Sequence, residues 1–180
     1  MFAVVGLCAT ASAAPPVLGT VVREVMATDS IRAHTLGLLA RGQVAEAIDY
    51  WAVATGKEVP AWLLAFRASF DASKQVAGAC QNVAGNIHTA FSQLGGSPQF
   101  VQLTTEAGAA RNYGFIVFKL ANGSEVSLSH TGYHVLVRMQ GRAYDAYTGA
   151  AGLPWAEYLS RLGARFPIAE MVVETTERVR

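Results

Sequence analysis

Three residues in the second half of the chain carry the side chains that nucleophilic enzymes use. Cys80 lies in the segment GACQNVAG, His134 in GYHVLVRM and Asp145 in RAYDAYTG. A carboxylate behind an imidazole fixes which ring nitrogen carries the proton, and it stabilises the imidazolium. Such a pair is useful when the other ring nitrogen faces a nucleophile, and a cysteine thiolate is a nucleophile that attacks carbonyl carbons.

The histidine and the aspartate fall on the two arms of one expected hairpin. The sequence GYHVLVRMQGRAYDAYTG alternates apolar residues on both sides of Gln140-Gly141. If these two residues form the turn, Leu136 lies opposite Asp145, and His134 shares a strand face with Leu136. His134 and Asp145 are then diagonal neighbours about 7–8 Å apart at the backbone, which their side chains can bridge. A turn longer by one residue would move the aspartate to the other face.

Cys80 begins a helix that is expected to end at Gly95-Gly96. The positive end of the helix dipole and the free N–H groups of the first turn favour a thiolate, and an imidazolium nearby would lower the thiol pKa further. A cysteine on an apolar helix is more often a small buried hydrophobe than a nucleophile, and Cys8, which lies in the apolar leader, is interpreted as structural. Cys80 is interpreted as a nucleophile because of the His-Asp pair; His130, the nearest rival base, is separated from that strand by Gly132.

Upstream of the cysteine, apolar residues recur at three- and four-residue steps, which predicts a small bundle of three helices. The first helix has Thr28 or Asp29 as its cap and ends at Gly42. The second ends at Gly56, and Pro60 suits the first turn of the third.

Downstream of the fourth helix the period changes to two, and glycine or Asn-Gly signals separate short runs rich in β-branched and aromatic residues. We expect an antiparallel meander of QFVQLTT, YGFIVFKL, EVSLS, YHVLVRM and RAYDAY, then a helix from Pro154 and a last strand, IAEMVVET. Because helices precede the sheet, the fold class is α+β.

Composition limits the range of functions. The chain of 180 residues has a net charge of +1, so it has no basic footprint for nucleic acid. The apolar start MFAVVGLCATASAAPP imitates a secretory signal without its basic region, or else marks the joint to a longer protein. It is too short to span a bilayer. We find no phosphate-loop pattern and no zinc spacing, and therefore expect no cofactor and no metal.

A cysteine at a helix start, a histidine leading a strand in GYHVLVRMQGRAYDA and an aspartate one strand later resemble the papain-like fold. More narrowly, residues 75 to 160 are similar to papain-like peptidase or deamidase domains of bacterial polymorphic toxins, in which closing segments run much like YDAYTGAAGLPWAEYL. The resemblance implies Cys80 as nucleophile, His134 as base and acid, and Asp145 as the residue that orients the histidine.

The oxyanion donor is less clear from the resemblance. Papain-like enzymes often carry a glutamine six residues before the cysteine, but here that position is Lys74. Gln75, Gln81 and the backbone N–H of Cys80 are the candidates.

These patterns predict an α+β protein in three parts: an apolar leader or linker over 1–27, a helical segment over 28–73 and a third part over 74–180, which the resemblance implies is a papain-like catalytic domain. The expected function is a cysteine-dependent hydrolase, a protease or glutamine deamidase acting on a protein substrate. The resemblance implies a toxin or effector that is secreted or delivered into a target cell, with an immunity protein or a larger delivery protein as partner. Two alternatives remain open: a non-catalytic partner-binding domain, and a secreted cell-wall amidase or endopeptidase.

Overall fold

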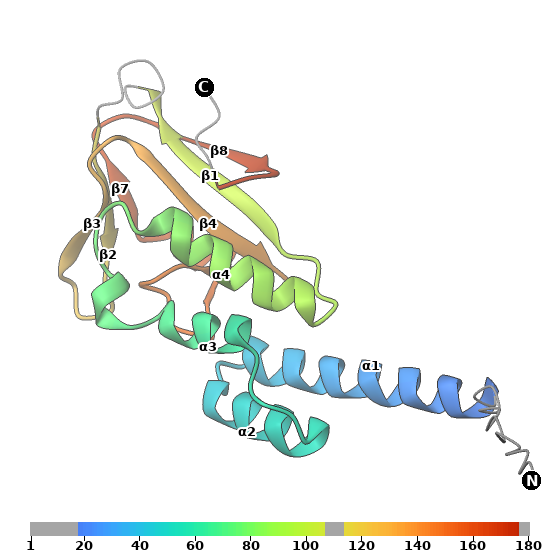
Figure 1. Ribbon diagram of the computed structural model, residues 1–180. Coiled ribbons are helices and arrows are strands. Elements are labelled where there is room, and N and C mark those ends of the chain that lie inside the picture. Colours follow the sequence, from blue (N-terminus) through green and yellow to red (C-terminus); the bar gives the residue numbers. More distant parts are fainter. Residues whose placement is uncertain (1–17, 107–113, 177–180) are drawn as a thin grey trace, which may run out of the picture.

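The computed structural model describes residues 18–106 and 114–176. In Figure 1 the N-terminal helices lie at one end of the molecule and the strands at the other, with α4 (Cys80–Gln93) packed across β4 (Tyr133–Met139) and β1 (Gln99–Thr105). The long helices precede the strands in the chain, and one short helix lies among the strands near its end, so the α+β class is confirmed.

The N-terminal helices agree only in part with the pattern. They are α1 (Leu18–Ala40), α2 (Val44–Thr55), α3 (Ala61–Ala68) and the short 3-10 helix η1 (Ala72–Lys74). The predicted cap at Thr28 or Asp29 is wrong, because both residues lie inside α1. No glycine or proline interrupts residues 20–36, so nothing ends the helix there. α1 therefore runs through the expected boundary between the leader and the helical segment.

The later boundaries follow the sequence signals more closely. α2 ends before Gly56, which adopts φ 62° as a left-handed C-cap, and Pro60 is the N-cap of α3. α3 ends at Ala68. α4 begins at Cys80 as expected and ends at Gln93, just before the two glycines.

The strands form two antiparallel sheets instead of one meander. Besides β1 and β4, the strands are β2 (Ile116–Lys119), β3 (Glu125–Ser129), β5 (Arg142–Tyr144), β6 (Leu153–Pro154), β7 (Leu162–Ala164) and β8 (Ile168–Val173). One sheet has the order β6-β5-β4-β1-β8, and the other has the order β3-β2-β7. The meander was wrong because β1 pairs with β4 and β8 and not with β2. The helix predicted after Pro154 is α6 (Trp155–Ser160).

The hairpin that carries the histidine has the predicted register. Val137 pairs with Tyr144 and Met139 with Arg142, so Gln140-Gly141 is the two-residue turn. Both turn residues have positive φ, 49° and 74°, as a type I′ turn requires. The register places His134 and Asp145 on one side of the sheet.

Two apolar cores lie on opposite faces of the five-stranded sheet. Val135 and Val137 pack into the core below the helices, together with the buried face of α4. Leu136 faces the core that the three-stranded sheet and Tyr158 complete. By strand alternation, His134 points to the same side as Leu136. β4 is therefore covered on both faces, and its histidine is buried.

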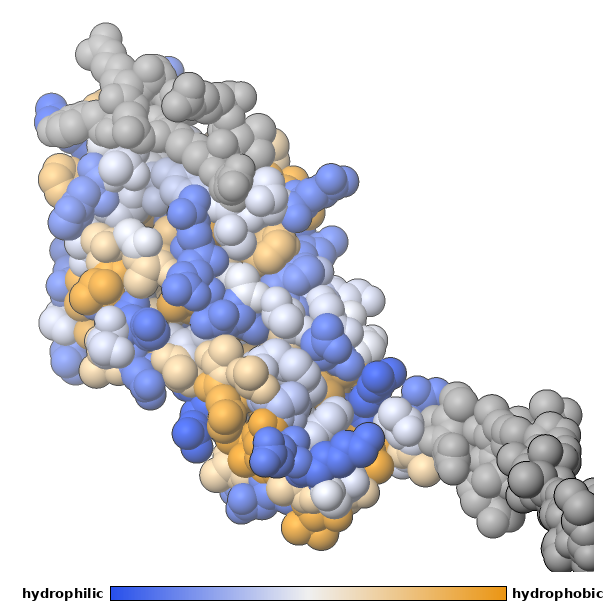
Figure 2. Space-filling model, viewed as in Figure 1, coloured by the Kyte–Doolittle hydropathy of each residue, from blue (hydrophilic) through white to orange (hydrophobic). Residues whose placement is uncertain are grey.

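Apolar side chains also remain at the surface of the helical end. Val53 of α2 is 85% exposed and Met26 of α1 is 68% exposed. Figure 2 shows apolar surface gathered over this end of the molecule. Within the described ranges, no helix is both long and apolar enough to cross a membrane.

Candidate active site

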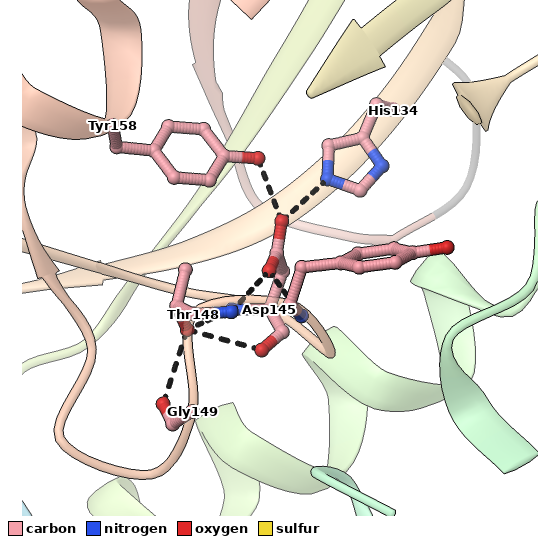
Figure 3. Close-up of polar contacts among 6 residues, drawn as sticks. His134, Asp145, Thr148, Gly149 and Tyr158 are labelled. Atoms are coloured by element: carbon pink, nitrogen blue, oxygen red, sulfur yellow. Dashed lines mark hydrogen bonds and ion pairs between the residues drawn. The ribbon is translucent and has the colours of Figure 1, made fainter. Parts of the chain in front are cut away.

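Asp145 is a buried carboxylate at the point where the chain leaves β5. Its Oδ1 accepts hydrogen bonds from the backbone N–H groups of Tyr147, at 2.7 Å, and Thr148, at 3.1 Å. Its Oδ2 accepts the hydroxyl of Tyr158 at 2.7 Å, as Figure 3 shows. Burial alone raises the pKa of Asp145, but His134, the Tyr158 hydroxyl and the Tyr147 N–H outweigh it, so the pKa lies below 3.8. The carboxylate is thus held ionised inside the protein.

His134 contacts this carboxylate from β4. Its Nε2 lies 3.3 Å from Asp145 Oδ2, and the ring is 3% exposed. Burial by itself lowers the pKa of His134, but hydrogen bonds and charge interactions with Asp145 and Cys80 raise it to about 9. The ring is consequently an imidazolium at neutral pH, and its orientation is set by the aspartate.

The second ring nitrogen of His134 remains available for the thiol. Since Nε2 is directed at the carboxylate, the nitrogen left for Cys80 is Nδ1. Among the described residues, Nδ1 has no hydrogen-bond partner of standard geometry, although it is buried. Cys80 lies close enough for each group to shift the pKa of the other. A buried polar nitrogen without a hydrogen-bond partner is costly, and a catalytic role is one of the reasons for which proteins keep such a group.

Cys80 is a half-buried, free thiol at the first position of α4. Burial raises its pKa. The hydrogen bond and charge of His134 and the backbone N–H groups of Val135 and Gln81 lower it by more, so the pKa lies below 9.0. The thiolate and the imidazolium therefore stabilise one another. Accessible, low-pKa thiols of this kind are the reactive ones.

A short strand allows the cysteine to reach the sheet. β5 ends at Tyr144, and its pairing with β4 covers only residues 137–139. On the edge of β4 that faces away from β1, no described strand therefore pairs with Val135. The start of α4 occupies this gap, so the Val135 N–H is directed at the sulfur of Cys80. Asp145 leaves the ladder at the same place, which brings all three residues of the candidate triad, Cys80, His134 and Asp145, together.

An open cleft of about 380 Å³ borders the thiol. The start of α4 and the β3–β4 loop line its two sides, with Ala77, Gly78, Cys80 and Gln81 facing Ser129, His130, Thr131 and Tyr133. Ser129 Oγ accepts the backbone N–H groups of Thr131 and Tyr133, both at 3.1 Å, and so shapes the turn before the histidine. His130 is exposed, and its ring is 5.5 Å from that of Phe115.

The oxyanion candidates have other partners in this structure. Gln75 Nε2 donates to the carbonyl of Ala146 at 3.1 Å, which joins the approach to α4 to the loop of Asp145. Gln81 Nε2 donates to the carbonyl of Thr176 at 3.0 Å. The backbone N–H of Cys80 belongs to the first helical turn, where donors have no intrahelical acceptor.

Tyr158 is the site residue that the sequence did not reveal. Its spacing with Trp155 predicts a core-facing stripe on the closing helix, and the ring is indeed fully buried. A buried tyrosine hydroxyl nevertheless needs a partner, and the partner here is the triad carboxylate. Burial and the charge of Asp145 raise the pKa of Tyr158 well above 10.0, so the hydroxyl stays protonated and donates.

The other cysteine and histidines do not join the site. Cys8 lies outside the described residues. His88 stacks on Phe100 with ring centroids 4.1 Å apart, and His34 lies 4.2 Å from the ring of Tyr50. In the described part of the chain no three or more histidine, cysteine, aspartate or glutamate residues are grouped so that they could hold a metal ion.

No family model, curated protein or solved structure matches this chain. The chemistry follows from the side chains themselves. The site combines a partly exposed thiol of lowered pKa with a buried imidazolium and an ionised carboxylate beside a cleft. This arrangement can form a covalent bond to a carbonyl carbon and move a proton to a leaving group.

Proposed function

We propose that the protein is a cysteine-dependent acyl-transfer hydrolase of the papain-like type, with Cys80 as nucleophile, His134 as acid and base, and Asp145 as the orienting carboxylate. One observation carries this proposal. A buried imidazolium, with a pKa raised to about 9, lies between an ionised carboxylate and a thiol that opens onto a cleft. Outside active sites, so many buried, mutually shifted groups seldom meet beside an opening.

The proposed reaction has two halves. The Cys80 thiolate attacks the carbonyl carbon of an amide, and a carbon–sulfur bond forms while the carbonyl oxygen becomes an oxyanion. His134 then gives its proton to the leaving nitrogen, the carbon–nitrogen bond breaks and a thioester remains. The now neutral His134 takes a proton from water, the resulting hydroxide attacks the thioester, and the acid and the thiolate are released.

We propose a protein as the substrate and an effector or toxin as the biological role, from the resemblance of the triad region to polymorphic-toxin domains. Hydrolysis of a backbone amide would be proteolysis, and hydrolysis of a glutamine side-chain amide would be deamidation. The same triad can carry out both reactions, so the triad residues do not distinguish proteolysis from deamidation.

A mixed protein extract separates the possibilities. The purified protein and its Cys80→Ser and His134→Ala variants are incubated with the extract, and new peptide N-termini and glutamine-to-glutamate conversions are mapped by mass spectrometry. Asn82→Ala, which changes an exposed residue of α4, is the control. We expect products from the wild type and the control only. Identical maps from the wild type and Cys80→Ser would contradict the proposal. A parallel incubation uses peptidoglycan fragments, and peptide release from these fragments alone would favour the cell-wall amidase.

A further inference from the structure

A carbonyl oxygen from the far end of the chain lies between the two elements that carry the reactive pair. β8 ends at Val173, and the chain then continues to Thr176. The main-chain carbonyl of Thr176 accepts one hydrogen bond from Gln81 Nε2, at 3.0 Å, and another from the Tyr133 hydroxyl, at 2.5 Å. Both lone pairs of this oxygen are therefore used by side chains of distant segments.

The two donors are the immediate neighbours of the triad. Gln81 follows Cys80 in the first turn of α4, and Tyr133 precedes His134 at the start of β4. Both also line the cleft that opens at the thiol. Tyr133 is only 8% exposed, so its hydroxyl is held in place by the core. Gln81 is exposed, so Tyr133 is the fixed donor of the two, and a fixed donor next to a nucleophile holds a carbonyl group at little cost in entropy.

We propose that Gln81 and Tyr133 form a subsite for a main-chain carbonyl of an extended polypeptide substrate, and that the C-terminal segment Glu174–Thr176 occupies it as a tethered competitor. This inference rests on the proposed function of the triad. The donors bind a backbone group, so the subsite selects an extended chain and not a particular side chain. A substrate must displace Thr176 before its own carbonyl takes these two hydrogen bonds.

The first test uses full-length variants and a small reagent that needs no carbonyl subsite. The rate of iodoacetamide alkylation is followed at Cys80 by mass spectrometry in the wild type, Tyr133→Phe, Gln81→Ala and the control Asn82→Ala. Removing either donor weakens the hold on the C-terminal segment, and one ordinary hydrogen bond corresponds to a factor of up to about ten. We expect Tyr133→Phe and Gln81→Ala to be alkylated severalfold faster than the control. Rates equal to or below that of the control would overturn the inference.

The second test supplies the segment as a separate peptide. A chain that ends at Glu174 keeps all of β8, and thermal unfolding establishes that it is folded. The synthetic peptide ETTERVR, which has the sequence of residues 174–180, is added to it, with a scrambled peptide as control. We expect the peptide to slow the alkylation of Cys80, and to lose this protection when Tyr133→Phe is added to the shortened chain. Equal protection by the scrambled peptide, or none by either, would overturn the inference.

Failure here is distinguishable from failure of the proposed function. The dependence of the Cys80 thiol pKa on His134 does not involve the C-terminal segment. If His134→Ala raises that pKa while the peptide gives no protection, the triad stands and the tethered competitor is wrong. If His134→Ala leaves the pKa unchanged, the proposed function fails, and with it this inference.

Discussion

Asp145→Asn is the most informative single substitution, because it removes the negative charge and keeps the shape of the side chain. The amide oxygen can still accept the two backbone N–H groups that Oδ1 accepts now. What is lost is the carboxylate beside His134 Nε2. We expect the pKa of His134 to fall and, since the imidazolium is the largest of the influences that lower the thiol pKa, the pKa of Cys80 to rise.

The expected change in thiolate population follows from the raised pKa of His134. A rise in the pKa of His134 from 6.5 to about 9 corresponds to roughly 3 kcal/mol of stabilisation of the imidazolium. Interactions with Asp145 are the largest of those that raise it, and Cys80 contributes the remainder. At least half of the stabilisation, about 1.5 kcal/mol, should disappear with the charge, and this is about a factor of ten in thiolate population.

The assay is the rate of iodoacetamide alkylation at Cys80 as a function of pH, resolved from Cys8 by mass spectrometry. At a pH below the ordinary thiol pKa of 9.0, Asp145→Asn should react about tenfold more slowly than the wild type. Asp49→Asn, which changes an exposed carboxylate of α2, is the matched control and should leave the rate unchanged. A Cys80 pKa that is the same in the wild type and Asp145→Asn would refute the coupling between carboxylate, imidazole and thiol.

Three further predictions concern stability. Because the folded pKa of His134 is raised to about 9 from 6.5, its contribution to stability is complete below pH 6.5 and is lost as the pH rises through 9. The folded pKa of Cys80 is lowered from 9.0, so its contribution to stability grows as the pH rises toward 9.0. The unfolding free energy of Cys80→Ala should therefore fall with pH between 6.5 and 9 while that of the wild type stays flatter; parallel curves would show that the thiolate is absent. Tyr158→Phe should lose roughly 2 kcal/mol of unfolding free energy in denaturant titrations, because a hydrogen bond to the triad carboxylate is removed, and an unchanged midpoint would contradict this role. Gly152→Ala should lower the free energy of unfolding by more than about 1 kcal/mol, since φ is +63° and a new Cβ would lie 2.8 Å from a carbonyl oxygen of β5. Gly123→Ala, where φ is also positive but the surrounding space is open, should lower it by less, and equal losses would show that the close contact at Gly152 is relieved at no cost.

Local features of the fold could be predicted from the sequence because neighbouring residues determine them. The segments QFVQLTT, EVSLS and YHVLVRM coincide with β1, β3 and β4, since their composition and bounding turn signals are sufficient. The turn at Gln140-Gly141 fixed the register, and the register placed the histidine and the aspartate on one side. The start of α4 at Cys80 and its end before Gly95-Gly96 were likewise predicted from neighbouring residues.

Contacts between distant segments could not be predicted in this way. The position of β1 between β4 and β8 depends on packing two sheets, and no local signal encodes it. RAYDAY was expected to stay in the ladder, but Asp145 leaves it to accept N–H groups of its own turn. The Tyr158 hydroxyl reaches Asp145 from 13 residues further along the chain. The Thr176 carbonyl reaches Gln81 from 95 residues further along.

The ultraviolet absorbance of the thiolate tests the central claim most directly. The absorbance of the wild type minus that of Cys80→Ala, measured across a pH titration, reports Cys80 alone because Cys8 is common to both chains. We predict that this thiolate signal persists below pH 9.0 and moves to higher pH in His134→Ala. A single transition at or above 9.0 that is the same with and without His134 would contradict it.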